Sequence, residues 1–381
     1  MGAAYVLTTN GTRRRIVVYG TSSDDVGEKL RRKMADSDKG IPVSAKAWTM
    51  AEYLRYWLEH VVKVRRPKTY QGYEGIVRNY LIPGLGKKKL HRLTAPDVRT
   101  FFTQVRSRCR CCTEGIDARR EEPRCCAIGR CCDLRLSVRS VQFIHAVLRN
   151  ALQNAMREEL VGRNVAKLVQ VETPNYRVNR GLSVEQARTL LREASGDRWY
   201  AFYVLALYLG MRRGELLGLR WRDVDFEAQQ LEIVNTLQRV DGELRFVPPK
   251  TRSSERTIPL PQICLDALKA HRARQAEDRL KVGDYWQDSD CVFATVIGTP
   301  VEPDNIRRSW YPLRERIGLE GVKLHDLRHS CVTLLLSIGV PPNVVREIVG
   351  HAHIGVTMEI YAHASLDQMR AALKRLDEHL A

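Results

Sequence analysis

The chain has 381 residues, which is enough for two or three domains that each bury a hydrophobic core. Its 62 lysine and arginine residues outnumber the 44 aspartate and glutamate residues, so the formal net charge is +18. This excess favours a polyanionic partner, most commonly nucleic acid, although the composition fits an unrelated basic enzyme equally well. The sequence has no run of about eighteen apolar residues, which argues against a membrane-spanning helix.

The first residues carry no export signal. Residues 13–15 are arginines that follow a short polar start, and no apolar segment comes after them. We therefore expect a cytoplasmic protein in a reducing compartment. There the ten cysteines are more often thiols or metal ligands than disulfides.

Residues 1–40 are predicted to form a small β-sheet unit. Two strand-like runs within residues 4–20 flank Asn10 and Gly11, a pair typical of tight hairpin turns. A helix is expected over residues 23–35, and residues 39–42 read as a linker. The basic strands of this unit suit contacts with phosphate groups.

Residues 44–170 are predicted to form a helical domain. A capping box at residues 49–52 starts its first helix, and a second helix over residues 69–80 is expected to end before the Pro-Gly-Leu-Gly sequence that follows. Thr94 caps a third helix, with proline in its first turn. A fourth covers residues 137–159, which carry apolar side chains at helical spacing.

A cysteine-rich insert at residues 109–132 separates the third helix from the fourth. Four thiolates suffice for a structural zinc site, and Cys109 with Cys112 makes one Cys-x-x-Cys pair, but no second pair has that spacing. A structural zinc site and a basic loop with incidental thiols are both compatible with this pattern. The seven cysteines of the insert are Cys109, Cys111, Cys112, Cys125, Cys126, Cys131 and Cys132.

Residues 180–381 are predicted to form a third domain after a polar linker at 171–180. A capping box at 183–186 begins a helix, and the apolar run 199–209 predicts a buried helix that stops at Gly210. Residues 231–247 indicate a hairpin around Asp241-Gly242, with a third strand at 256–260. The expected fold is therefore mainly α with small β-sheets.

Several polar residues of this domain suggest chemistry only when they are taken together. Arg212 and Glu215 are three residues apart, which is typical of an exposed ion pair on a helix. Lys250 follows a strand, where a lysine is usually solvated. His325 and Arg328 are also three residues apart, so both are expected on one side of a helix.

His351 and Tyr361 complete the set. In isolation, Tyr361 is most simply a core or interface tyrosine. Together with the preceding residues, however, the order Arg, Lys, His-x-x-Arg, Gly-His and Tyr resembles the tyrosine recombinase (phage-type integrase) family. Residues matching that order are Arg212, Lys250, His325, Arg328, His351 and Tyr361.

The resemblance is strong over the catalytic half and moderate over 44–170, which corresponds to the helical domain that binds core-type DNA sites. It is weak over 1–40, which corresponds to the small domain that binds arm-type sites. The cysteine-rich insert departs from the family pattern. The resemblance implies an integrase of a mobile element in a bacterial host, acting on double-stranded DNA at attachment sites as a homotetramer. An accessory directionality or DNA-bending protein is a further expected partner.

The resemblance also implies a role for each residue. Tyr361 would attack the scissile phosphorus and form a 3′-phosphotyrosine, with no metal or ATP needed for catalysis. Arg212 and Arg328 would clamp the phosphate, Lys250 would protonate the leaving 5′-oxygen, and His351 would donate to the phosphate. His325 is either the base or a phosphate ligand, and Glu215 braces these groups.

Two alternatives remain at this stage. A type IB topoisomerase uses similar chemistry as a monomer, and a regulator that has lost catalysis would keep only the fold. The N-terminal unit and an amphipathic helix predicted from Ser365 onward argue against the topoisomerase. The helix either packs on its own domain or, as the resemblance implies, docks on a neighbouring subunit. The complete set of six residues argues against the regulator.

Overall fold

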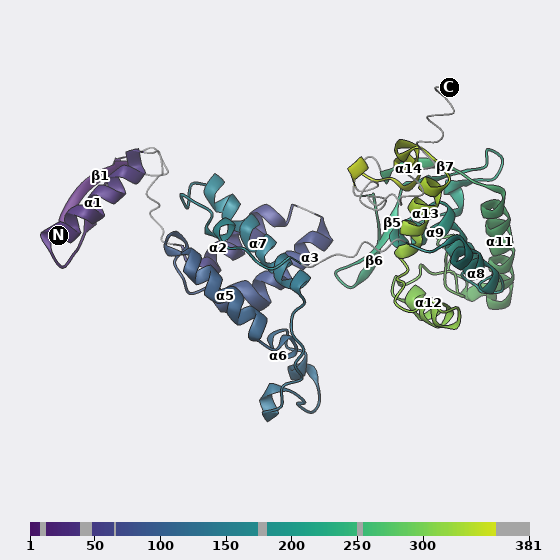
Figure 1. Cartoon of the computed structure of the whole chain (residues 1–381), viewed down its shortest axis with the longest axis horizontal. Helices are drawn as coiled ribbons and strands as arrows, with labels where there is room; N and C mark the ends of the chain where they lie inside the picture. Colours follow the sequence, from purple (N-terminus) through teal and green to yellow (C-terminus); the bar gives the residue numbers. More distant parts are fainter. Residues whose placement is uncertain (8–12, 39–47, 65, 174–180, 250–253, 356–381) are drawn as a thin grey trace, which may run out of the picture. The chain divides into compact units, whose positions relative to one another are not determined.

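The computed structural model describes residues 1–7, 13–38, 48–64, 66–173, 181–249 and 254–355 (Figure 1). The chain divides into two compact units, Met1–Tyr176 and Arg177–Ala381. Lys250, Tyr361 and the helix predicted after Ser365 lie outside the described residues. None of the described helices is both long and apolar enough to cross a membrane.

The N-terminal segment is a two-stranded sheet with one helix. Strand β1 (Gly2–Leu7) pairs antiparallel with β2 (Arg13–Val18), and α1 (Ser23–Asp38) lies against β1 (Figure 1). Val6, Val18 and Val26 are buried where sheet and helix meet. The expected turn at Asn10-Gly11 lies outside the described residues, and the helix runs three residues past its predicted end.

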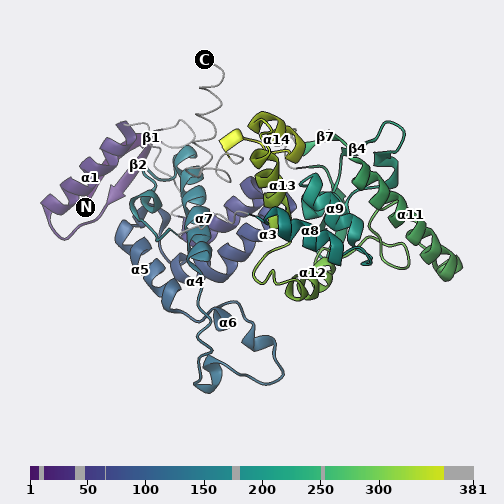
Figure 2. The same cartoon turned by 45° about the vertical axis from the view of Figure 1, so that its right-hand side comes forward.

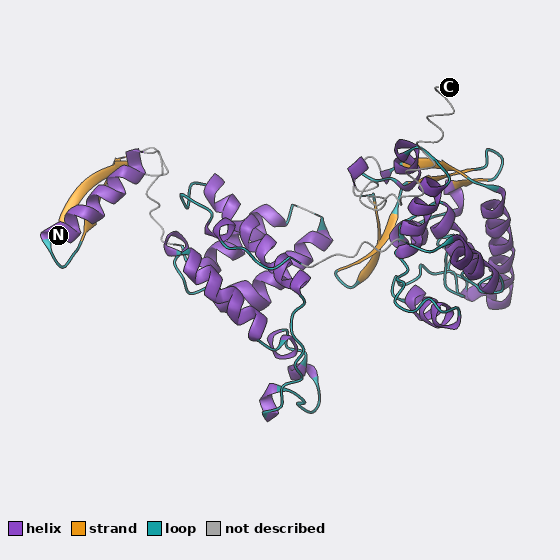
Figure 3. Ribbon diagram, viewed as in Figure 1, coloured by secondary structure: helices purple, strands orange, loops and turns teal. Residues whose placement is uncertain are grey.

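The following part of the first unit is helical, as predicted (Figure 3). Tyr53, Trp57, Ile144 and Leu148 lie in its core and are almost fully buried. Its helices are α2 (Met50–Trp57), continued by a π-helix (Leu58–Val62), α3 (Pro67–Ile76), continued by a second π-helix (Val77–Leu81), α4 (Ile82–Leu85), a 3₁₀ turn (Leu90–Arg92), α5 (Ala95–Ser107), α7 (Val138–Arg157) and a last 3₁₀ turn (Val165–Leu168).

The expected end of the second helix before Pro83 is wrong. The backbone widens to a π-helix just before α4, and Pro83 occupies the first turn of that segment. A wider turn gives the proline ring room, and a first-turn proline loses no hydrogen bond that the segment needs. The capping box predicted at Thr49 and the cap predicted at Thr94 are confirmed, since each hydroxyl accepts a hydrogen bond from the backbone N–H three residues later.

The second unit packs its helices around a nearly all-apolar one, α9 (Tyr200–Tyr208), which lies between α11 and α13 in both views (Figure 1 and Figure 2). The predicted buried helix over 199–209 is thereby confirmed. The remaining helices are α8 (Val184–Glu193), α10 (Arg213–Leu217), α11 (Gln262–Val282), α12 (Asn305–Arg316), α13 (Asp326–Ser337) and α14 (Pro342–Val349), with 3₁₀ turns at Trp221–Asp223 and Gly283–Tyr285.

The strands of this unit form two small sheets, whereas the sequence predicts a hairpin over 231–247 followed by a third strand. Strand β4 (Gln230–Ile233) pairs with β3 (Val224–Asp225) and β7 (Arg256–Pro259), whereas β5 (Thr236–Val240) pairs with β6 (Glu243–Val247). The hairpin at Asp241-Gly242 is confirmed, but the single strand expected from residue 231 to 240 breaks at residues 234–235. Leu231 and Ile233 alternate with exposed Glu232, but Thr236 and Leu237 are both buried, so the alternation of β4 does not continue into β5.

Candidate active site

The pair formed by Arg212 and Glu215 is built around the start of α10. Arg212 is the N-cap residue: its backbone N–H donates to Glu215 Oε2 (2.9 Å) and its Nη1 donates to Glu215 Oε1 (2.6 Å). Its Nη2 donates to the carbonyl of Gly350 (2.8 Å). The Glu215 side chain is 1% exposed and that of Arg212 is 37% exposed. The pair is therefore not the exposed ion pair that its spacing alone suggests, because only the arginine reaches solvent.

Arg256, on β7, is a second partner of the same carboxylate. Its Nη2 donates to Glu215 Oε2 (3.3 Å) and its Nε to the carbonyl of Ile348 (2.8 Å), and the side chain is 7% exposed. Burial raises the pKa of Glu215, but the charges of Arg256 and Arg212 outweigh it and hold that pKa below its usual value. The sequence analysis missed this residue. A usable signal was its spacing from Ile258. Residues two apart in a strand point to the same face, so Arg256 lies on the same inner face as buried Ile258.

Arg328 is the most deeply buried guanidinium of the site, with 2% of the residue exposed. Its Nη1 donates to the carbonyl of Gly210 (2.5 Å), but its Nη2 has no hydrogen-bond partner in the described part of the chain. An unpaired buried donor is costly unless a ligand or another group satisfies it. This donor is therefore available to an acceptor such as a phosphate oxygen.

Two of the predicted histidines flank the arginines. His325 is the N-cap residue of α13 rather than a residue within the helix, and its ring meets that of His329 edge-on at 5.1 Å between centroids. Burial, together with the charges of His329 and Arg328, lowers the pKa of His325 to about 4. His351 follows Gly350, the C-cap of α14, and burial with the nearby charges of Arg328 and Arg212 lowers its pKa to about 3. Both imidazoles are therefore neutral near pH 7.

The carbonyls of Gly210 and Gly350 accept hydrogen bonds from Arg328 and Arg212, respectively, and so hold the two side chains in the site. Gly210 has φ +58° and Gly350 has φ +67°, in the left-handed region that favours glycine. A Cβ on Gly210 would lie 2.7 Å from Val349 Cγ1 and 3.2 Å from Cys331 Sγ. The backbone at Gly210 thus approaches α13 and α14 too closely for a side chain.

The structure brings five of the predicted site residues into one region and adds Arg256 to them. The predicted residues are Arg212, Glu215, Arg328, His325 and His351. Lys250 and Tyr361 lie outside the described residues, so their positions stay predictions.

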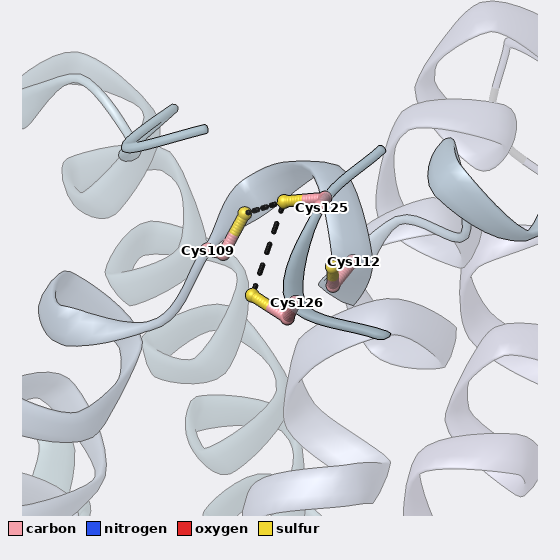
Figure 4. A group of neighbouring side chains, drawn as sticks. All are labelled: Cys109, Cys112, Cys125 and Cys126. Atoms are coloured by element: carbon pink, nitrogen blue, oxygen red, sulfur yellow. Dashed lines mark hydrogen bonds between the residues drawn. The ribbon is translucent and has the colours of Figure 1, made fainter. Parts of the chain in front are cut away.

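The cysteine-rich insert forms a separate cluster of thiols in the first unit. Its short elements are α6 (Arg110–Thr113) and 3₁₀ turns at Asp117–Arg119 and Cys126–Ile128. The sulfur atoms of Cys109, Cys112, Cys125 and Cys126 all lie within 4.8 Å of one another (Figure 4). Those of Cys111, Cys125 and Cys132 form a second such set, whereas Cys131 belongs to neither.

Comparison with known proteins identifies the class of protein that has this fold and site. The phage integrase family matches residues 180–367, and the N-terminal SAM-like domain of phage integrases matches residues 49–104. An integrase of Streptomyces ambofaciens is 30% identical over 360 residues, covering 91% of this chain and 85% of that protein. A XerC-like tyrosine recombinase of Caldanaerobacter subterraneus subsp. tengcongensis is 27% identical, covering 97% of this chain and 93% of its own.

Solved structures agree in fold. The Tn1549 transposon integrase in complex with a circular intermediate DNA aligns with a TM-score of 0.66 at 20% identity, covering 86% of this chain and 99% of that one. A lambda integrase dimer bound to a COC′ core site aligns with a TM-score of 0.52 at 16% identity, covering 81% of this chain and 97% of that one.

The chain therefore belongs to the phage integrase family of tyrosine recombinases, enzymes that cleave and rejoin DNA and need no cofactor for catalysis. The predicted family and the α-rich fold with small sheets are confirmed. The relatives are integrases and transposases, which favours neither the topoisomerase nor the silent regulator.

Replacing Glu215 with glutamine tests the buried carboxylate. The change leaves Arg212 and Arg256 without their negative partner, so we expect the catalytic unit to lose about 3–5 kcal/mol of unfolding free energy. Urea unfolding measures the loss. Glu243→Gln is the matched control, because its ion pair with Arg245 is exposed and should contribute less than about 1 kcal/mol. Equal losses in the two variants would contradict this account of the site.

Replacing Gly210 with alanine tests the close approach of the helices. The added methyl group meets Val349 and Cys331 and forces a left-handed backbone on alanine, so a loss above about 1 kcal/mol is expected. DNA cleavage should fall more than DNA binding, because the carbonyl that holds Arg328 moves. Gly196→Ala is the control, since its Cβ meets nothing within 4 Å. Wild-type cleavage by the Gly210 variant would refute the role of this carbonyl.

The buried histidines predict a dependence of stability on pH. Because their folded pKa values lie below the unfolded value of about 6.5, the unfolded chain binds more protons between about pH 6.5 and the folded pKa, which is about 3 for His351 and about 4 for His325. The stability from neutral His351 should be complete above pH 6.5 and decline as pH falls through this window. His351→Gln should flatten the decline in thermal unfolding, whereas replacing exposed His353 with glutamine should not. Parallel curves for wild type and His351→Gln would exclude this role.

Proposed function

We propose that the arginine-rich site cleaves one DNA strand with Tyr361 as the nucleophile and rejoins it to another. The observation that carries the proposal is the set of three guanidiniums around a single buried carboxylate, with Arg328 Nη2 left unpaired among the described residues. Planar guanidiniums match the geometry of two phosphate oxygens better than lysine does. Arg212, being partly exposed, and Arg328, with its unpaired donor, are the proposed clamps of the scissile phosphate.

The proposed reaction is a transesterification. The Tyr361 oxygen attacks phosphorus, the bond from phosphorus to the 5′-oxygen breaks, and the 3′-phosphate stays on the tyrosine. Lys250 gives its proton to the departing 5′-oxygen, while the phenol proton leaves for a base or for water. Rejoining reverses these steps with a 5′-hydroxyl from another strand, so the bond energy is kept and no ATP is needed.

His325 and His351 are proposed to act as hydrogen-bond donors to the phosphate. An imidazole whose pKa is about 4 in the free protein is a weak base toward a phenol. A bound phosphate adds negative charge and makes protonation of the ring easier. His325 is therefore better suited to binding phosphate first and to accepting the phenol proton only in the DNA complex. Glu215 and Arg256 position Arg212 without touching DNA.

The domain roles follow the family. We assign residues 1–40 to arm-type sites, 44–170 to core-type sites and 180–381 to catalysis. The match of residues 49–104 to the integrase SAM-like domain and the alignment with DNA-bound integrases support this assignment. The net charge of +18 suits a double-stranded DNA partner.

The proposed setting is the cytoplasm of a bacterial host, where the enzyme recombines attachment sites of a mobile element as a homotetramer. Relatives named as integrases and as Tn916 and Tn1545 transposases support the mobile element. A directionality or DNA-bending protein would complete the assembly. The cysteine-rich insert is proposed to hold structural zinc, which takes no part in catalysis.

A nicked suicide substrate carrying the attachment site tests the proposed nucleophile. Wild type should accumulate a covalent adduct on the 3′-phosphate. The short fragment that carries the released 5′-hydroxyl diffuses away, so the strand cannot be rejoined. Tyr361→Phe should bind the same DNA with similar affinity but form no adduct, and Tyr285→Phe, which alters an exposed tyrosine, should behave as wild type.

An adduct formed by Tyr361→Phe would overturn the assignment of the nucleophile. Strand exchange between two attachment sites separates the recombinase from a topoisomerase. An adduct without exchange would favour the topoisomerase, and DNA binding with no adduct in wild type would favour the silent regulator.

A further inference from the structure

The core of the cysteine-rich insert is made almost entirely of sulfur. Its buried cluster consists of Cys109, Cys111 and Cys125, with Cys112 and Ile116 packed against it. A segment of this size cannot bury enough apolar surface to hold a fold unless a metal or disulfides reinforce it. Cys109 Sγ and Cys125 Sγ are 3.4 Å apart, well beyond the bond length of a disulfide, about 2.05 Å. The residues therefore fit a metal better than disulfides.

The distances suit zinc. Four sulfurs placed tetrahedrally at about 2.3 Å from zinc lie about 3.8 Å from one another. Cys125 Sγ lies 3.4 Å from Cys109 Sγ and 3.9 Å from Cys126 Sγ (Figure 4). Cys109 Sγ also lies 3.6 Å from Cys132 Sγ. The thiols are thus already near the spacing of a tetrathiolate site, and small rotations of their side chains complete it.

Some of these sulfurs accept hydrogen bonds from backbone N–H groups, as metal-bound cysteines usually do. The backbone N–H of Cys132 donates to Cys125 Sγ (3.3 Å), and that of Asp133 donates to Cys131 Sγ (3.4 Å). Such bonds stabilise thiolate charge and fix the ligand loops.

A buried carboxylate holds the loop that carries Cys125. Asp117 accepts from the backbone N–H groups of Arg124 (3.0 Å) and Cys125 (3.2 Å) and from Arg120 Nη1 (2.8 Å). Arg120 in turn interacts electrostatically with Cys111 and Cys132, so its positive charge offsets part of the negative charge that thiolates bring.

One ion leaves too many thiols unused. A single zinc takes four ligands, whereas the insert gathers seven cysteines. The two sets of neighbouring sulfurs overlap at one member, Cys125. Two tetrahedra that share one corner require seven sulfurs, the number present.

Resting on the structural-zinc part of the proposed function, we propose that the insert binds two Zn²⁺ ions bridged by the Cys125 thiolate. Cys109, Cys112 and Cys126 complete the first site, and Cys111, Cys131 and Cys132 the second. The side chain of exposed Cys131, which interacts with those of Cys109 and Cys126, rotates toward the second ion when the cluster forms. The seven thiols release one proton each to solvent, and the Cys125 thiolate then forms a bond to each ion.

Hydrogen bonds join the two ends of the insert. Arg110 N–H donates to the carbonyl of Leu134 (2.8 Å), and Arg135 donates to the carbonyl of Ser107, so the end of α5 meets the segment that enters α7. Two ions bound next to these hydrogen bonds would fix the direction in which the insert leaves the helical core.

Zinc stoichiometry of the full chain tests the proposal. Purified under reducing conditions without chelator, the wild type should carry two zinc atoms per chain by plasma emission spectroscopy. Cys132→Ser should carry one, and Cys125→Ser should retain the least after a challenge with EDTA, because both ions lose a ligand. Cys264→Ala, which changes a buried cysteine outside the insert, should keep two.

Cobalt titration of the wild type gives a second readout that needs no variant. Thiolate-to-cobalt absorption should rise until two equivalents are bound, and the electron paramagnetic signal of the first ion should fall as the second couples to it through the shared sulfur. One zinc per chain, or two uncoupled cobalt ions, would overturn the bridged cluster while leaving structural metal in place. No bound metal would overturn both. The Tyr361 adduct is scored separately, so failure of catalysis does not affect these outcomes.

Discussion

The carboxylate of Glu215 is the charge on which the geometry of the site depends. It lies between Arg212, three residues before it at the start of the same helix, and Arg256, which comes from β7 and meets it only in the folded chain. Burying the guanidinium of Arg256 is costly unless a charge and hydrogen bonds compensate it, and the carboxylate with the fixed acceptors supplies both. With Arg328 included, three guanidiniums interact with this one carboxylate among the described residues. The site keeps a positive surplus, and the transition state of phosphoryl transfer carries more negative charge than the phosphodiester.

Two helix ends supply the rest of this compensation. Gly210 follows the end of α9 and Gly350 caps α14, and their carbonyls accept hydrogen bonds from Arg328 and Arg212. The C-terminal end of a helix carries partial negative charge, so it stabilises a guanidinium without neutralising it. Neutral imidazoles at His325 and His351 add donors without adding charge. The site is thus prepared for an anion before DNA arrives.

The parts of this site that could be predicted are those set by short spacing. Arg212 with Glu215 and His325 with Arg328 are three residues apart, so local backbone geometry brings each pair together, and the capping boxes that start the helices are equally local. Arg256 could not be found in this way, because its acceptor at Ile348 is 92 residues away and only the packed fold joins them. The break between β4 and β5 is likewise set by burial of neighbouring residues, which alternation along one strand does not reveal.

The structure of the cysteine-rich insert could also be predicted only in part from its sequence. Its composition is compatible with a metal site and with incidental thiols alike. The usual paired spacing is missing because the sulfurs come from turns that Asp117 helps to hold together, not from two regular knuckles. The described groups that we propose for catalysis come from residues 210–351, whereas the insert belongs to the first unit. The energetic role that we propose for a metal in the insert is to replace a hydrophobic core that so short a segment cannot build, and this requires strong bonds to a few sulfurs rather than many weak contacts.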